Sequence, residues 1–161
     1  MTHSDQVVPR GNGRGMGPGP DRGSIEHRLI TMRRSLAQLD ALGPVDRACL
    51  DGDPATGLVV ERILALMADL AFGINCHVAA AVSGEAPKTF AASFRVAENV
   101  GMLDERPAAA LLLPDGPHVL VQLCLDTEPD EVAAVVSAAG SGYREYLRQA
   151  ASWAANRAPE A

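Results

Sequence analysis

The sequence has few aromatic residues, which make up only 4% of its 161 residues. Strands of β-sandwiches and barrels are rich in aromatic and β-branched side chains, whereas the alanine and leucine that abound here favour helices. The composition therefore argues against an all-β fold and predicts a helical one.

Cysteine is also scarce, and its placement excludes two kinds of structural site. The three cysteines are Cys49, Cys76 and Cys124, and no two of them form a C-x-x-C pair. An odd, widely spaced set fits neither a disulfide framework nor a structural zinc site. We therefore expect no metal, no cofactor and a reducing, cytoplasmic environment.

Positive charge is in deficit, because 20 acidic residues outnumber 14 basic ones and leave a net charge of −6. Proteins that attract nucleic acid or anionic membranes through the electrostatic field of their net charge are basic. The negative net charge therefore indicates neither partner. No apolar run approaches the ~18 residues that indicate a membrane helix, and the N-terminus lacks the apolar core of a signal peptide. We expect a cytoplasmic protein that does not engage a membrane.

What is present is a globular composition, with 47% hydrophobic and 21% charged residues. Residues 1–23 are rich in glycine, proline and arginine and predict a disordered tail, and residues 24–157 predict one helical domain. The glycine-rich stretch that starts at Gly11 lacks the strand and the helix that flank a phosphate loop. It is interpreted as flexible chain, with a weak RNA-contacting arm as the alternative.

Apolar residues recur every three or four positions after Ser24, a good helix N-cap, until Gly43 and Pro44 end the pattern. The first predicted stripe consists of Ile25, Leu29, Met32, Leu36 and Leu39. The longest helix is predicted from Asp53 or Pro54 to about Val82. Its predicted stripe consists of Val59, Ile63, Leu66, Leu70, Ile74 and His77, with Val60, Met67 and Val78 beside it. Of these, His77 is interpreted as a structural histidine rather than a ligand.

Three further segments complete the predicted fold. Pro87 suits the first turn of a third helix, which Gly101 closes, and a fourth segment spans residues 104–113. The last helix has Pro129 in its first turn, and two glycines in its middle predict a kink. These segments predict an all-α fold, an antiparallel bundle of four to five helices.

The stretch DGPHVLVQLCLD, residues 115–126, carries His118, Gln122 and Cys124 on an apolar background. A cysteine nucleophile needs a nearby base or a helix N-terminus. His118 and Cys124 are more than one and a half helical turns apart, which argues against a direct pair. The residues alone therefore indicate a helical core segment rather than a reactive site.

The face of the first predicted helix opposite its apolar stripe is predicted to carry Arg28, Arg33 and Arg34, together with Gln38. Such a group is either a solvated face or a contact for nucleic acid or an acidic partner. These arginines are the RNA-binding candidates of the sequence.

The order of segments resembles the HepT-like toxins, a branch of the HEPN superfamily of helical domains. The likeness covers about residues 25–155. It rests on residues 28–33, 60–64, 69–77, 87–90, 93–94, 97–103, 119–121, 125–126 and 143–146. The resemblance implies a homodimeric helical bundle that pairs with a minimal nucleotidyltransferase antitoxin.

Active members of that family are metal-independent endoribonucleases with an Arg-Asn-x-x-x-His-x-Tyr motif. The resemblance implies that the histidine acts as acid or base, that the arginine clamps the phosphate, and that the antitoxin modifies the tyrosine. Here the four motif positions carry Pro117, His118, Gln122 and Cys124. Proline, glutamine and cysteine cannot supply these functions, so the motif is degenerate and only His118 could act.

Three functions follow from this resemblance. The first is a catalytically inactive HepT-like protein that acts through dimerisation and partner binding. The second is an active toxin with a rearranged site, in which His118 is the base and the three arginines of the first helix hold the phosphate. The third is a helical interaction module unrelated to toxicity.

Overall fold

The computed structural model describes residues 20–112 and 129–157, and all regular structure in these ranges is helical. The helices are α1 (Arg22–Ala41), α2 (Arg47–Gly52), α3 (Pro54–Ser83), α4 (Phe90–Asn99), α5 (Glu105–Leu111) and α7 (Pro129–Asn156). The predicted all-α bundle is confirmed. Within the same ranges, every helix is too short or too polar to cross a lipid bilayer.

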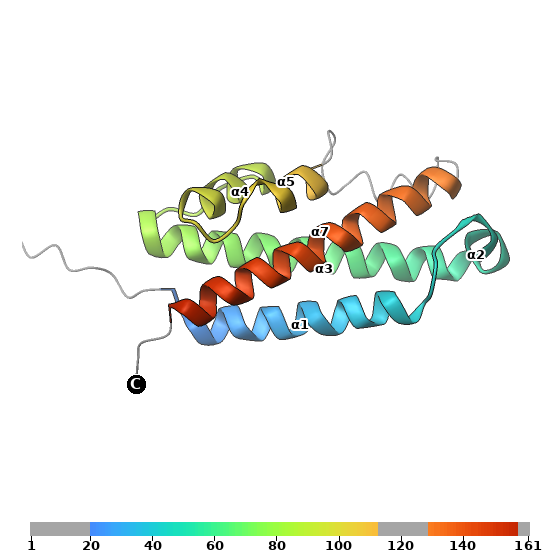
Figure 1. The fold of residues 1–161 in the computed structure, drawn as a ribbon, viewed down its shortest axis with the longest axis horizontal. Helices are drawn as coiled ribbons and strands as arrows, with labels where there is room; N and C mark the ends of the chain where they lie inside the picture. Colours follow the sequence, from blue (N-terminus) through green and yellow to red (C-terminus); the bar gives the residue numbers. More distant parts are fainter. Residues whose placement is uncertain (1–19, 113–128, 158–161) are drawn as a thin grey trace, which may run out of the picture.

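Three long helices, α1, α3 and α7, lie side by side and form the body of the bundle (Figure 1). α1 runs opposite to both α3 and α7. Of the short helices, α4 packs on α3 and α5 packs on α7, while α2 covers the end of the bundle where α3 begins. The short α2 was not anticipated as a separate helix by the sequence pattern.

The core matches the predicted stripe on α1 but only in part on α3. All five apolar residues predicted for the first helix are buried on α1. On α3, however, Val59 is 47% exposed, and Leu66, Leu70 and His77 are only partly buried. Val60, Met67 and Val78, predicted to lie beside the stripe, are buried. The buried apolar residues of α3 are Val60, Ile63, Leu64, Met67, Ala68, Ala71, Ile74, Val78 and Ala79. The buried face of α3 is broader than the predicted stripe because α1, α4 and α7 all contact this helix.

α1 begins earlier than predicted, because Asp21 rather than Ser24 caps it. The Asp21 carboxylate accepts a hydrogen bond from the Gly23 amide at 3.2 Å, as expected of an N-cap. The Asp21 amide donates to Nε2 of His77 at 2.7 Å, which confirms the structural interpretation of His77. Arg22 and Gly23, predicted to be disordered, are therefore helical, and Asp21 is ordered as their cap. Residues 1–19 of the predicted tail lie outside the described residues.

The ends of α4 also differ in part from the prediction. Thr89 caps the helix by accepting a hydrogen bond from the Ala92 amide at 3.1 Å, so Pro87 precedes the helix and does not occupy its first turn. The predicted stop at Gly101 is confirmed. Gly101 has a φ of 76°, and the Met102 amide beyond it donates to the Ala97 carbonyl at 2.9 Å. This backbone pattern is a Schellman C-cap, which favours glycine.

α7 continues through the two glycines that predicted a kink, Gly140 and Gly142. Gly142 instead permits close packing of α5, because a Cβ there would lie 2.8 Å from the Ala110 Cβ and from a Leu111 methyl carbon. Gly140 has more room, with the nearest side-chain atom at 3.4 Å. The two glycines therefore have different roles on the same helix.

Candidate functional site

The four positions of the degenerate catalytic motif, Pro117, His118, Gln122 and Cys124, lie outside the described residues. Their interpretation therefore remains a prediction from the sequence. The structure describes the helices on either side of this segment and the three arginines that were predicted to act with it.

The three RNA-binding candidates do not share one face of α1. The Arg28 side chain is half-buried, whereas Arg33 and Arg34 are exposed. An α-helix turns by about 100° per residue, so these three positions point to different sides of the helix. α1 alone does not gather them into a single phosphate clamp.

Arg28 lies across α3 at a position where glycine makes room for it. A Cβ on Gly73 would be only 2.7 Å from Nη1 of Arg28. Among the described residues, no hydrogen bond or ion pair reaches this guanidinium. Its positive charge nevertheless acts on two neutral groups nearby, Cys76 and Tyr146. Arg28 is thus held by packing rather than by a carboxylate.

Cys76 is a protonated thiol in this environment. Burial raises the pKa of Cys76, and the nearby Arg28 guanidinium only partly opposes the rise. The thiol donates a long hydrogen bond of 3.6 Å to the Pro87 carbonyl. A reactive cysteine needs a lowered pKa, so Cys76 is a structural residue.

A buried polar network joins α3, α4 and α7. The Tyr146 hydroxyl donates to Oδ1 of Asn75 at 2.8 Å and also lies 3.2 Å from the Ala71 carbonyl. The Asn75 amide in turn donates to Oγ of Ser93 at 3.1 Å, and Ser93 donates to the Phe90 carbonyl at 2.7 Å. Asn75, Ser93 and Tyr146 all have 0% exposure, so the network is shielded from water.

This network is built for structure rather than for proton transfer. Burial, reinforced by the neighbouring Tyr143, raises the pKa of Tyr146 well above its ordinary value, so the hydroxyl remains a donor. In the part of the chain that the structure describes, no deeply buried side-chain nitrogen or oxygen lacks a hydrogen-bond partner. Such complete pairing specifies which helices pack together, because an unpaired polar group in the interior is costly.

The sequence pattern predicted no role for Asn75 or Ser93, and it gave Tyr146 no partner. The available signal was the position of Asn75, which is four residues after Ala71 and eight after Met67. That spacing puts an amide on the buried face of α3. A buried amide requires a partner, although the sequence does not say which one.

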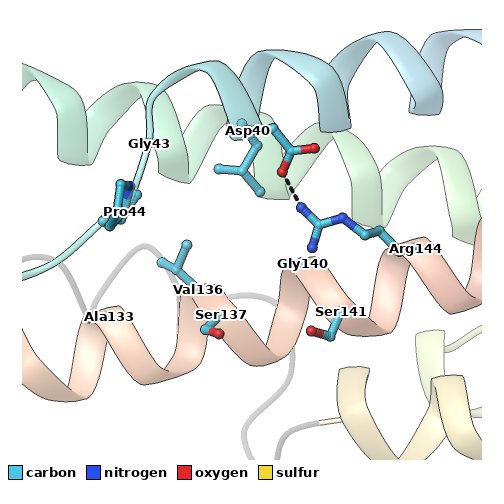
Figure 2. Close-up of a pocket in the computed structure, with 11 residues that line it drawn as sticks. Asp40, Gly43, Pro44, Ala133, Val136, Ser137, Gly140, Ser141 and Arg144 are labelled. Atoms are coloured by element: carbon cyan, nitrogen blue, oxygen red, sulfur yellow. Dashed lines mark hydrogen bonds and ion pairs between the residues drawn. The ribbon is translucent and has the colours of Figure 1, made fainter.

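A hollow of about 360 Å³ lies between the end of α1, the chain that follows it and the first half of α7 (Figure 2). The Asp40 carboxylate accepts a hydrogen bond from the Arg144 guanidinium at one side. The hydroxyls of Ser137 and Ser141 are also in its lining. The charged pair is neutralised and the lining described here contains no histidine. The hollow can therefore hydrogen-bond a small polar molecule, but it offers no general base.

A metal site is not formed by the residues that are described. Across residues 20–112 and 129–157, no three histidine, cysteine or acidic side chains lie close enough together to hold a metal ion. No protein-family model and no curated protein matches the chain.

Proposed function

We propose that the chain is a HepT-like HEPN protein of a toxin–antitoxin module, of endoribonuclease ancestry and without catalytic activity. It acts in the cytoplasm as a homodimer and binds a nucleotidyltransferase-type partner. The proposal joins the resemblance in the sequence with the geometry of the helical bundle.

The observation that carries the proposal is the meeting of two stretches on which the resemblance rests. Residues 69–77 contribute Asn75, residues 143–146 contribute Tyr146, and the two side chains form a buried hydrogen bond of 2.8 Å. Ser93, from a third such stretch, completes the network. Segments that are far apart in sequence thus build one joint in the core, as expected if they define a common scaffold.

The inactivity follows from the side chains at the motif positions. Pro117 has no charge with which to clamp a phosphate, and Gln122 cannot exchange a proton near neutral pH. An active site assembled from His118 and the arginines of α1 is less well supported, because Arg28, Arg33 and Arg34 point to different sides of that helix. The protein is therefore proposed to keep the helical fold of the family and to have lost its ribonuclease activity.

An RNA-cleavage assay in the presence of a metal chelator tests both halves of this proposal. We expect the native protein to leave single-stranded RNA intact. A variant that restores the family motif, with Pro117→Arg, His118→Asn, Gln122→His and Cys124→Tyr, is expected to cleave it. Cleavage by the native protein that His118→Ala abolishes would contradict inactivity. A folded but inactive restored variant would count against endoribonuclease ancestry.

Partner binding requires a separate experiment. The chain is co-expressed with any minimal nucleotidyltransferase that is encoded beside it, and a tag on one chain is used to purify the other. Co-purification at a fixed ratio is expected. If no such neighbour is encoded, or if the two chains do not co-purify, the third function, an interaction module unrelated to toxicity, is favoured instead.

A further inference from the structure

The end of the bundle where α1 begins and α7 finishes carries two hollows that share one wall. That wall is formed by Trp153 and Arg157, which line both hollows. The Arg157 guanidinium lies 4.4 Å from the centre of the Trp153 ring, a stacked cation–π arrangement. Trp153 is the one tryptophan of the sequence, and it is only partly buried.

The first hollow has a volume of about 360 Å³ and combines an apolar floor with two cations. Its apolar lining comes from Pro20, Ile25 and Ala154 together with the Trp153 ring. Its two cationic lining residues are Arg22 and Arg157. Volumes of this order are typical of small-ligand sites, which pair apolar walls with a few polar groups.

The guanidinium groups of this hollow retain donors for a ligand. Arg22 is paired through Nε with Glu26 in an exposed ion pair of the i, i+4 type, which leaves its terminal nitrogens available. No carboxylate among the described residues lies within ion-pair distance of Arg157. In a protein with a net charge of −6, two arginines that converge on one apolar hollow form a local site for a negative charge.

The second hollow is larger, about 570 Å³, but its polar groups are already engaged with one another. The Arg148 guanidinium donates to Glu145, and the Gln149 amide donates to the Asp104 carboxylate at 2.9 Å. Asp104 also places a negative charge in the lining. An anion would have to displace these partners, so the first hollow is the better site.

We propose that the first hollow binds a small aromatic anion, a planar ring that carries a phosphate or carboxylate group. The ring packs on the Trp153 side of the hollow, and Arg22 and Arg157 hold the anionic group by charge-assisted hydrogen bonds. This site is independent of the degenerate motif and of the partner proposed above.

Fluorescence of the single tryptophan tests this proposal on the full-length protein. Phenyl phosphate is the probe, and inorganic phosphate and phenol supply its two halves separately. We expect a saturable fluorescence change with phenyl phosphate, and at least tenfold weaker binding of either half. Equal binding of inorganic phosphate would overturn the role of the ring, and a non-saturable response to phenyl phosphate would overturn the site.

Two substitutions locate the binding. Arg157→Gln and Arg22→Gln are each expected to weaken phenyl phosphate binding at least fivefold, whereas Arg95→Gln on the exposed face of α4 should leave it unchanged. Arg22, Arg95 and Arg157 are all exposed, so circular dichroism should show an unaltered fold in each case. Equal affinity in all three variants would refute the proposed location.

Discussion

Tyr146 and Asn75 show how one pair of side chains fixes the packing of whole helices. The pair is fully buried and its hydrogen bond is 2.8 Å long. A second bond carries the connection from Asn75 to Ser93 on α4. The alternative packings of these apolar helices would leave the same polar groups unpaired, so the network selects one arrangement.

The substitution Tyr146→Phe removes the hydroxyl and leaves the Asn75 carbonyl oxygen without its donor in the core. A buried acceptor that loses its partner costs about 1–3 kcal/mol. We expect the free energy of unfolding, measured by urea denaturation, to fall by that amount.

Tyr143→Phe is the matched control for this change. Tyr143 is also buried, but its hydroxyl has no hydrogen bond to another described residue. The control should therefore lose less than about 0.5 kcal/mol, as for a substitution that removes no pairing. Equal losses in the two variants would show that the network is not a stabilising element.

At the scale of helices, the contact between α5 and α7 depends on the absence of one side chain. A Cβ on Gly142 would lie 2.8 Å from Ala110, which is too close for both helices to keep their positions. The nearby Gly140 faces the hollow of Figure 2 and has no such contact. The same residue type is thus needed at one position and merely tolerated at the other.

Alanine at these two positions should have opposite effects. Gly142→Ala is expected to lower the stability by about 1–3 kcal/mol through overpacking. Gly140→Ala is expected to raise it by up to about 1 kcal/mol, because alanine favours helix more than glycine does. Thermal unfolding followed by circular dichroism measures both. Stabilisation by Gly142→Ala would mean that α5 does not pack as described.

A group of charged and polar side chains also joins the start of α5 to α7. Arg106 lies 2.9 Å from the Glu145 carboxylate, and Gln149 accepts a hydrogen bond from the Asp104 amide at 2.7 Å. The hydrogen bond from Arg148 lowers the pKa of Glu145 to about 2, and Gln149 contributes further. Hydrogen bonding from Arg106 holds the pKa of Asp104 well below its usual range.

These lowered pKa values predict the response of this joint to acid. Both carboxyls bind protons more weakly in the folded state than in the unfolded chain, where the pKa of glutamate is about 4.3. Their stabilisation is therefore complete above that pH and is lost as the pH falls toward 2. The melting temperature should fall with pH between about 4.5 and 2, the range between the unfolded and folded pKa values of Glu145. Glu145→Gln should make this fall less steep, whereas Glu85→Gln in an exposed loop should not.

The sequence predicted helices more reliably than it predicted their contacts. Apolar periodicity located the long helices and the buried face of α1, because burial repeats with the helical turn, but it placed the buried face of α3 only in part. It placed the cap of α1 at Ser24 rather than Asp21, and it did not find the hydrogen bond from the Asp21 amide to His77, which joins residues 56 positions apart. It also did not pair Asn75 with Tyr146 or bring Trp153 to Arg22. These contacts depend on how the helices pack against one another, which the apolar periodicity of a single helix does not reveal.

At the scale of the whole molecule, the proposed dimer makes a direct prediction. We expect multi-angle light scattering at micromolar concentration to report twice the chain mass of 16.9 kDa. Exposed apolar side chains on the described surface include Leu58 at 66% and Val82 at 55%, and they are available for such contacts. A single species of 16.9 kDa would remove the dimer from the proposed function.

The hydrogen bond between Asn75 and Tyr146 joins residues 71 positions apart, and this separation has a kinetic consequence. A ribosome completes α1 to α4 well before it makes α7. The side-chain oxygen of Asn75 therefore has no Tyr146 hydroxyl to bond until α7 has been synthesised. Bringing Asn75 and Tyr146 together closes a long loop of chain, and the loss of chain entropy precedes the stabilising contacts. We expect nascent chains that stop short of α7 to remain open and helical, and the docking of α7 to be the last step of folding.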